Sequence, residues 1–169
     1  MKNIQLVCVY LRMIFAAVPH YNIKVLEMNK KVFLGGTANG SLWREILKPK
    51  LKIDYFDPVL PHRTEEAYQR ELKERRDCDY CLYVITPKMT GCYSIAEVVD
   101  DSNKHPDKTV FCFIDTDDMA EFSPSQVKSL VAVGRMVERN GGHWLSNLDE
   151  VADFLNHSVD NKDHKESLE

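Results

Sequence analysis

The sequence has no surplus of basic residues. Its 169 residues include 22 lysines and arginines against 26 aspartates and glutamates, which gives a formal net charge of -4. Proteins that bind a nucleic-acid polymer neutralise many phosphates with lysine and arginine. The charge balance therefore argues against a general nucleic-acid binder, although it leaves a single nucleoside or nucleotide open as a ligand.

Cysteines are few and odd in number, at positions Cys8, Cys78, Cys81, Cys92 and Cys112. Because disulfide-stapled secreted domains are far richer in cysteine, we expect a reducing, cytoplasmic compartment. Cys78 and Cys81 form a C-x-x-C pattern that enters an apolar strand, where an odd spacing points side chains to opposite faces. We therefore expect them to pack in the core rather than form a redox pair or a zinc site.

Long hydrophobic runs are also missing. The most apolar stretch, residues 4–18, is interrupted by Arg12, is followed by no signal-peptidase pattern and is too short to span a bilayer. We expect no membrane partner. A natural first strand begins just after Met28, so residues 1–28 are predicted to be an N-terminal extension, native or added. Residues 29–156 are expected to form one domain, and residues 157–169 a polar, disordered tail.

Metal-ligand spacing is absent from the sequence, which scatters its six histidines. The acidic run Asp115-Thr-Asp-Asp118 lacks the glycine and the distal glutamate of a calcium loop, so a solvated turn is expected there. The run from Gly35 to Gly40 reads G-G-x-x-x-G and matches neither the dinucleotide fingerprint nor the P-loop. No metal and no cofactor are therefore predicted.

What the sequence does contain is a regular alternation of short apolar runs with amphipathic stretches. Strands are predicted at residues 32–34, 53–56, 80–85, 109–114 and 143–145, each followed by a helix. The expected helix caps are Ser41, Thr64, Ser94, Ser123 and Asn147. This order predicts a doubly wound, flavodoxin- or Rossmann-like α/β fold, with a five-stranded, mostly parallel sheet and helices on both faces.

A doubly wound sheet binds its ligand at the carboxyl ends of the strands, where the winding reverses. That rule selects two loops, residues 35–40 after the first strand and residues 86–94 after the third. Glycines in the first loop allow the backbone to approach a ligand, and they equally suit a tight turn between strand and helix.

Two glutamates are candidate catalytic groups. Glu97 lies in the first turn of the helix after the third strand, although a capping box with Ser94 would also explain it. Glu71 lies on the preceding helix, where an i,i+4 ion pair with Arg75 on a solvated face is the alternative explanation.

The order of four sequence segments is more specific than either glutamate alone. Val32-Phe-Leu-Gly-Gly, Asp54-Tyr-Phe-Asp-Pro58, the charged helix that runs into Asp79 and a hydrophobic strand, and Gly91-Cys-Tyr-Ser-Ile-Ala-Glu97 follow one another. This succession, over about residues 31–115, resembles the nucleoside 2-deoxyribosyltransferase family, and in particular its deoxyribosyltransferase-like branch. The most specific elements are the carboxylate of Glu71 eight residues before Asp79, and the small-residue loop that leads to Glu97.

The resemblance implies that Glu97 is a nucleophile that attacks the anomeric carbon of a 2-deoxyribonucleoside, as the carboxylate of a retaining glycosidase does. Glu71 aligns with the family's assisting aspartate. The tyrosine that orients the family's nucleophile falls on Phe33, so Tyr93 or Tyr83 would have to supply the hydroxyl. Gly91 replaces the aspartate of transferases and the serine of related nucleotide hydrolases, which leaves the substrate preference open.

The expected function is cleavage or transfer of the bond between base and deoxyribose, with Glu97, Glu71 and Tyr93 as catalytic residues. The alternatives are a nucleoside 5′-monophosphate hydrolase of the same fold and a non-catalytic nucleotide-binding or sensing module. The resemblance also implies a homodimer or larger homo-oligomer. Trp43 and Met89 would stack on a base or pack in the core. The predicted substrate contacts are Gly35, Gly36, Thr37, Asn39, Trp43, Asp57, Met89, Thr90, Gly91 and Ser94.

Overall fold

Five parallel strands form a central sheet in the computed structural model, which describes residues 29–62 and 64–160. The strands lie in the order β2-β1-β3-β4-β7, and each neighbouring pair is parallel. The predicted doubly wound α/β fold is confirmed. The winding reverses between β1 and β3, which lie side by side. The strands are β1 (Lys31–Gly36), β2 (Asp54–Phe56), β3 (Tyr80–Ile85), β4 (Thr109–Phe113) and β7 (His143–Leu145).

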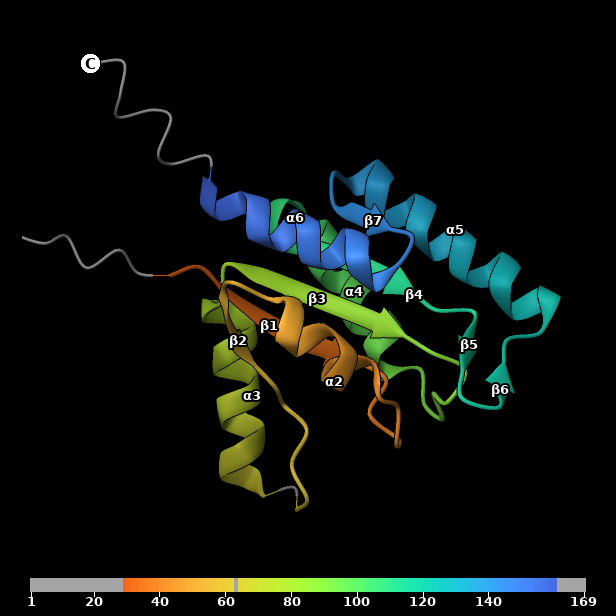
Figure 1. The fold of residues 1–169 in the computed structure, drawn as a ribbon, viewed down its shortest axis with the longest axis horizontal. Helices are drawn as coiled ribbons and strands as arrows, with labels where there is room; N and C mark the ends of the chain where they lie inside the picture. The colour runs from red at the N-terminus through yellow and green to blue at the C-terminus, as the bar shows by residue number, and fades with distance from the viewer. Residues whose placement is uncertain (1–28, 63, 161–169) are drawn as a thin grey trace, which may run out of the picture.

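Helices cover both faces of the sheet (Figure 1). One face carries α2 (Trp43–Leu47) and α6 (Leu148–Asp160), and the other carries α4 (Tyr93–Lys104) and α5 (Pro124–Asn140). Helix α3 (Glu65–Asp77) contacts α4 near the β2 edge. Short 3-10 turns, η1 (Lys48–Lys50) and η2 (Pro106–Lys108), and an antiparallel hairpin of β5 (Thr116–Asp117) and β6 (Ala120–Glu121) complete the connections.

Alternate side chains of each central strand enter two hydrophobic layers. Val32, Leu34 and Leu82 pack beneath α2 and α6, whereas Phe33 and Tyr83 pack beneath α4 and α5. Both faces are therefore dry, and this explains why the strands read as continuous apolar runs rather than as alternating ones.

Three of the predicted helix caps are confirmed. Thr64 accepts a hydrogen bond from the backbone N–H of Ala67, and Ser123 forms a capping box with Gln126. The side chain of Asn147 accepts the backbone N–H groups of the first turn of α6.

The predicted caps Ser41 and Ser94 are wrong. Leu42 and Cys92 occupy the two N-cap positions, so Ser94 lies inside α4 and the predicted capping box with Glu97 does not form. The start of α2 at Trp43 also determines which of its side chains are buried. Trp43 and Leu47 are buried, whereas Leu42 and Ile46 are 59% and 50% exposed.

Cys78 and Cys81 confirm the prediction of core packing, whereas Cys92 is exposed. Cys78, Cys81 and Cys112 are buried, and burial raises the pKa of the Cys78 and Cys81 thiols to about 11 and about 12. The expectation that Cys78 and Cys81 point to opposite faces is wrong, since both belong to the layer beneath α4 and α5. Cys78 is the C-cap of α3 and precedes β3, so strand alternation does not apply to it.

The structure differs from the prediction in one loop and at one domain end. The acidic run after β4 forms the β5–β6 hairpin, and α6 continues to Asp160, past the expected domain end at residue 156. The predicted extension, residues 1–28, and the rest of the tail, residues 161–169, lie outside the described residues. Within the described part of the chain, no helix is long and apolar enough to cross a membrane.

The end of β1 requires glycine. Gly36 has φ +109°, and a Cβ at this position would lie 2.1 Å from the carbonyl oxygen of Val84. The chain leaves the sheet here, and the backbone N–H of Thr37 donates to the same oxygen at 2.9 Å. The glycine therefore permits both the left-handed turn and the close approach of β1 to β3.

We predict that Gly36→Ala lowers the free energy of unfolding by at least about 2 kcal/mol, because it adds a steric clash to a strained backbone. Gly40→Ala is the matched control. Its φ is also positive, +69°, but no described atom lies within 4 Å of the added Cβ. A cost of about 1 kcal/mol is expected there. Chemical denaturation measures both, and equal costs would contradict the steric explanation.

Candidate active site

A cavity of about 220 Å³ opens where the end of β1 meets α3 and α4. It brings together both predicted catalytic glutamates, Glu71 from α3 and Glu97 from α4, with Tyr93, Gly35 and Gly36. It lies beside the point of the sheet where the winding reverses. Its lining residues are Phe33, Gly35, Gly36, Ala38, Arg44, Pro58, Val59, Leu60, Ala67, Glu71, Tyr93 and Glu97.

Glu97 is only 8% exposed and contacts Arg75 of the neighbouring helix, whose side chain is 16% exposed. Its Oε1 lies 3.1 Å from Nη1 of Arg75, and its backbone oxygen accepts a hydrogen bond from Nη2 at 3.3 Å. Arg75 also donates to both carboxylate oxygens of Asp101, and the Tyr83 hydroxyl donates to Asp101. A buried carboxylate requires such a partner, because an isolated charge is costly away from water.

The guanidinium of Arg75 carries its charge in this network. Burial alone would lower the pKa of Arg75, but the hydrogen bond with Asp101 and the negative charges of Asp101 and Glu97 raise it above its ordinary value. The structure thus turns Arg75 toward the two acidic residues of α4, whereas Glu71 lies on the wall of the cavity.

Tyr93 lies at the rim of the cavity, where it is 57% exposed. The negative charge of Glu97 raises the pKa of Tyr93, with smaller contributions from burial and from Tyr68. Tyr93 is therefore protonated at neutral pH, and its hydroxyl forms a hydrogen bond with Tyr68. Tyr83, the other proposed substitute for the hydroxyl missing at Phe33, is buried and donates to Asp101 instead.

Arg44 is the lining residue that the sequence analysis missed. It is 4% exposed, and it donates to the carbonyl oxygens of Leu34 at 2.8 Å and Thr37 at 2.6 Å. Burial lowers its pKa to about 10, against the opposing charges of Asp57, Glu45 and Glu71, so it is still charged at neutral pH. No local pattern marks an arginine on a short helix as buried, and only the packing of α2 against the end of β1 reveals it.

Asp57, predicted to bind substrate, forms ion pairs with two basic side chains of the protein. Its carboxylate lies 3.3 Å from Nε of Arg44 and 2.6 Å from Nζ of Lys48. Arg44 and Asp57 together tie the carboxyl ends of β1 and β2, which form one side of the cavity.

The two loops selected from the sequence bind each other. The side chain of Asn39 donates to Thr90 Oγ1 at 2.6 Å and to the backbone oxygen of Lys88 at 3.3 Å. The Lys88 ammonium donates in turn to the backbone oxygen of Gly40. Buried Thr37 accepts the backbone N–H of Thr86. Thr37, Asn39 and Thr90 thus join the loops and lie outside the lining of this cavity.

The remaining predicted contacts also lie outside the lining. Trp43 is 1% exposed and donates to the backbone oxygen of Thr37, so stacking on a base is wrong for this residue. Met89 packs against the hydrophobic layer beneath α4 and α5. A Cβ added to Gly91 would have no described atom within 4 Å, and Ser94 is part of the first turn of α4.

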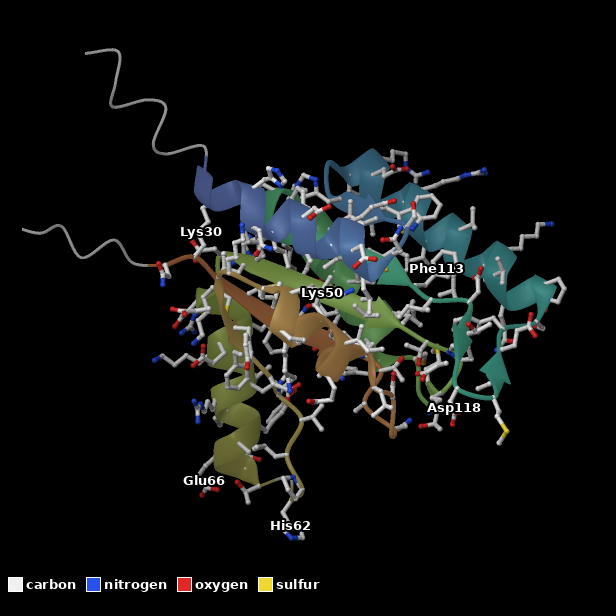
Figure 2. All side chains as sticks on the ribbon, viewed as in Figure 1. Lys30, Lys50, His62, Glu66, Phe113 and Asp118 are labelled. Atoms are coloured by element: carbon white, nitrogen blue, oxygen red, sulfur yellow. The ribbon has the colours of Figure 1, made fainter. Side chains whose placement is uncertain are left out.

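A larger cavity, about 730 Å³, lies at the carboxyl ends of β4 and β7 beside α2. Figure 2 labels two of its lining residues, Phe113 and Asp118, on the side of the molecule away from Glu66 at the start of α3. Its acidic residues include Asp117, which pairs with Lys88 at 3.4 Å. None of the predicted catalytic residues lines it. Among the described residues, no group of three or more histidines, cysteines or carboxylates is placed to hold a metal ion.

Comparison with known proteins does not assign the chain to a family, since no family model matches the sequence and no curated protein matches it significantly.

We predict that Arg44→Met lowers the free energy of unfolding by about 3 kcal/mol, because it removes a buried donor from the carbonyl oxygens of Leu34 and Thr37 and one of the two cations that pair with Asp57. The control is Arg76→Met on α3. The side chain of Arg76 is 72% exposed and pairs with Asp77, so a change within about 0.5 kcal/mol is expected. Urea denaturation compares the two, and a similar small cost for both would contradict a structural role for Arg44.

Proposed function

We propose that the protein cleaves the N-glycosidic bond of 2-deoxyribonucleosides, with Glu97 as the nucleophile. The observation that carries this proposal is the convergence of Glu97 and Glu71 on one cavity at the end of β1. The resemblance to nucleoside 2-deoxyribosyltransferases supports the same two residues. Cleavage of a glycosidic bond through an oxocarbenium-like state uses two carboxyl groups in different roles.

In the first step, a carboxylate oxygen of Glu97 forms a bond to C1′ of the sugar. The bond between C1′ and the base nitrogen breaks, and its electron pair stays on the base. The departing base takes up a proton, which Glu71 delivers from the wall of the cavity. The product is a free base and a deoxyribosyl ester of Glu97.

In the second step, a nitrogen of an acceptor base attacks C1′ and releases the Glu97 carboxylate. The proton lost by the acceptor returns to Glu71, which restores both groups to their starting states. Attack by water in place of the acceptor gives hydrolysis. Tyr93, which is protonated and lines the same cavity as Glu97, is suited to donate a hydrogen bond to the sugar.

The charges of the cavity favour a nucleoside over a nucleotide. Two glutamates line it, and Arg44 is the only cation among the described lining residues. The guanidinium of Arg44 already donates to Leu34 and Thr37 and pairs with Asp57. A 5′-phosphate would thus meet negative charge without a dedicated donor, which is unfavourable in a partly buried site.

We predict that Glu97→Gln lowers turnover of deoxynucleosides by about a thousand-fold or more, because an amide oxygen is a much poorer nucleophile than a carboxylate. The assay incubates the protein with the four deoxynucleosides and their monophosphates, with and without a free acceptor base. Chromatography then separates base exchange, which indicates transfer, from release of free base, which indicates hydrolysis.

The matched control is Asp100→Asn, an exposed carboxylate on the same helix that pairs with Lys104. It should leave turnover unchanged. Equal rates for Glu97→Gln and the wild type would contradict the assignment of the nucleophile. Binding of deoxynucleosides without turnover by the wild type would support a sensing module instead, and faster turnover of monophosphates would support the hydrolase.

A further inference from the structure

We infer that Arg75 is a positioning residue for the nucleophile, which orients the Glu97 carboxylate from an anchor made by Asp101 and Tyr83. This inference rests on the proposed function. Arg75 comes from α3 and Glu97 from α4, so the contact between them joins the two helices that supply Glu71 and Glu97 to the cavity.

The geometry of the guanidinium shows why it can orient another group. Arg75 donates from Nε to Asp101 Oδ2 at 2.9 Å and from Nη2 to Asp101 Oδ1 at 2.7 Å. Two parallel hydrogen bonds to one carboxylate fix both the position and the plane of a guanidinium. The remaining Nη1 is thereby held 3.1 Å from Oε1 of Glu97.

The anchor itself is buried. Asp101 is 7% exposed, lies one helical turn after Glu97 on α4, and accepts the hydroxyl of Tyr83 from β3. Arg75 therefore cannot rotate away from Glu97 without breaking two charged hydrogen bonds to a buried carboxylate, for which a lost partner is costly.

The consequence for the reaction is orientation. When one oxygen of a carboxylate is fixed, rotation of the whole group is restricted, and the path of attack on C1′ is set. Misplacement of a reacting group by about 1 Å can cost about a hundred-fold in rate. A loss of orientation should therefore appear in kcat, whereas KM should change little because Arg75 does not line the cavity that holds the substrate.

The experiment measures kcat and KM for the preferred deoxynucleoside in Arg75→Ala, Arg75→Lys and Tyr83→Phe. We expect kcat to fall by about a hundred-fold in Arg75→Ala and by about ten-fold in Arg75→Lys, which keeps the charge but loses the planar fork. Tyr83→Phe, which removes a donor from Asp101 and leaves Arg75 intact, should cost about three-fold. KM should stay within about three-fold in all three variants.

Chemical rescue separates positioning from a structural role. Guanidinium ion at low millimolar concentration, compared with sodium chloride at the same concentration, should restore part of kcat in Arg75→Ala and none in Glu97→Gln. Arg76→Ala is the matched control on α3, because this exposed neighbour pairs with Asp77. It should behave like the wild type.

Several results would overturn the inference. They are an unchanged kcat in folded Arg75→Ala, a loss that appears only in KM, and a loss in a folded variant that guanidinium does not restore. If Arg75→Ala does not fold, an unchanged kcat in Arg75→Lys overturns it. An inactive wild type overturns the proposed function as well, whereas an active wild type with an inactive Glu97→Gln and a fully active Arg75→Ala overturns this inference alone.

Discussion

The candidate site depends on buried charge that the protein neutralises from within. Arg44 is buried and Arg75 is only 16% exposed, so an unpaired guanidinium would be unfavourable at either position. Arg75 is satisfied by Glu97 and Asp101 of the neighbouring helix, and Arg44 by carbonyl oxygens at the end of β1 and by Asp57. Each arginine thus joins two elements, and the cavity lies between the elements that they join.

Close packing at the end of β1 is the second requirement. A Cβ on Gly35 would lie 2.9 Å from the ring of Tyr83, and a Cβ on Gly36 would collide with the backbone of Val84. The two glycines therefore let β1 approach β3 and leave room for Tyr83, which anchors Asp101. Gly35 and Gly36 therefore line the cavity, and their lack of a side chain also leaves space for the Tyr83 ring and the backbone of Val84.

The chemistry of the cavity follows from these constraints. Glu97 is held as a buried carboxylate by a charged arginine, a suitable state for a nucleophile, while Tyr93 keeps its proton at the rim. Asn39 and Lys88 join the two loops, so Asn39 and Thr90, which the sequence analysis predicts as substrate contacts, already bind each other. Fewer of the predicted substrate contacts therefore line the cavity than the sequence analysis expects. Its two glutamates come from α3 and α4.

The sequence by itself determined the order of strands and helices along the chain, the parallel doubly wound sheet, most helix caps, and the two glutamates that converge on the cavity. These features follow from local periodicity and from the handedness of crossover connections, which depend on neighbours in the chain. Only the tertiary structure decided that α2 starts at Trp43, that Arg44 is buried, and that Arg75 binds across to α4. Burial and long-range pairing are properties of packed surfaces, and residues far apart in the sequence determine them jointly.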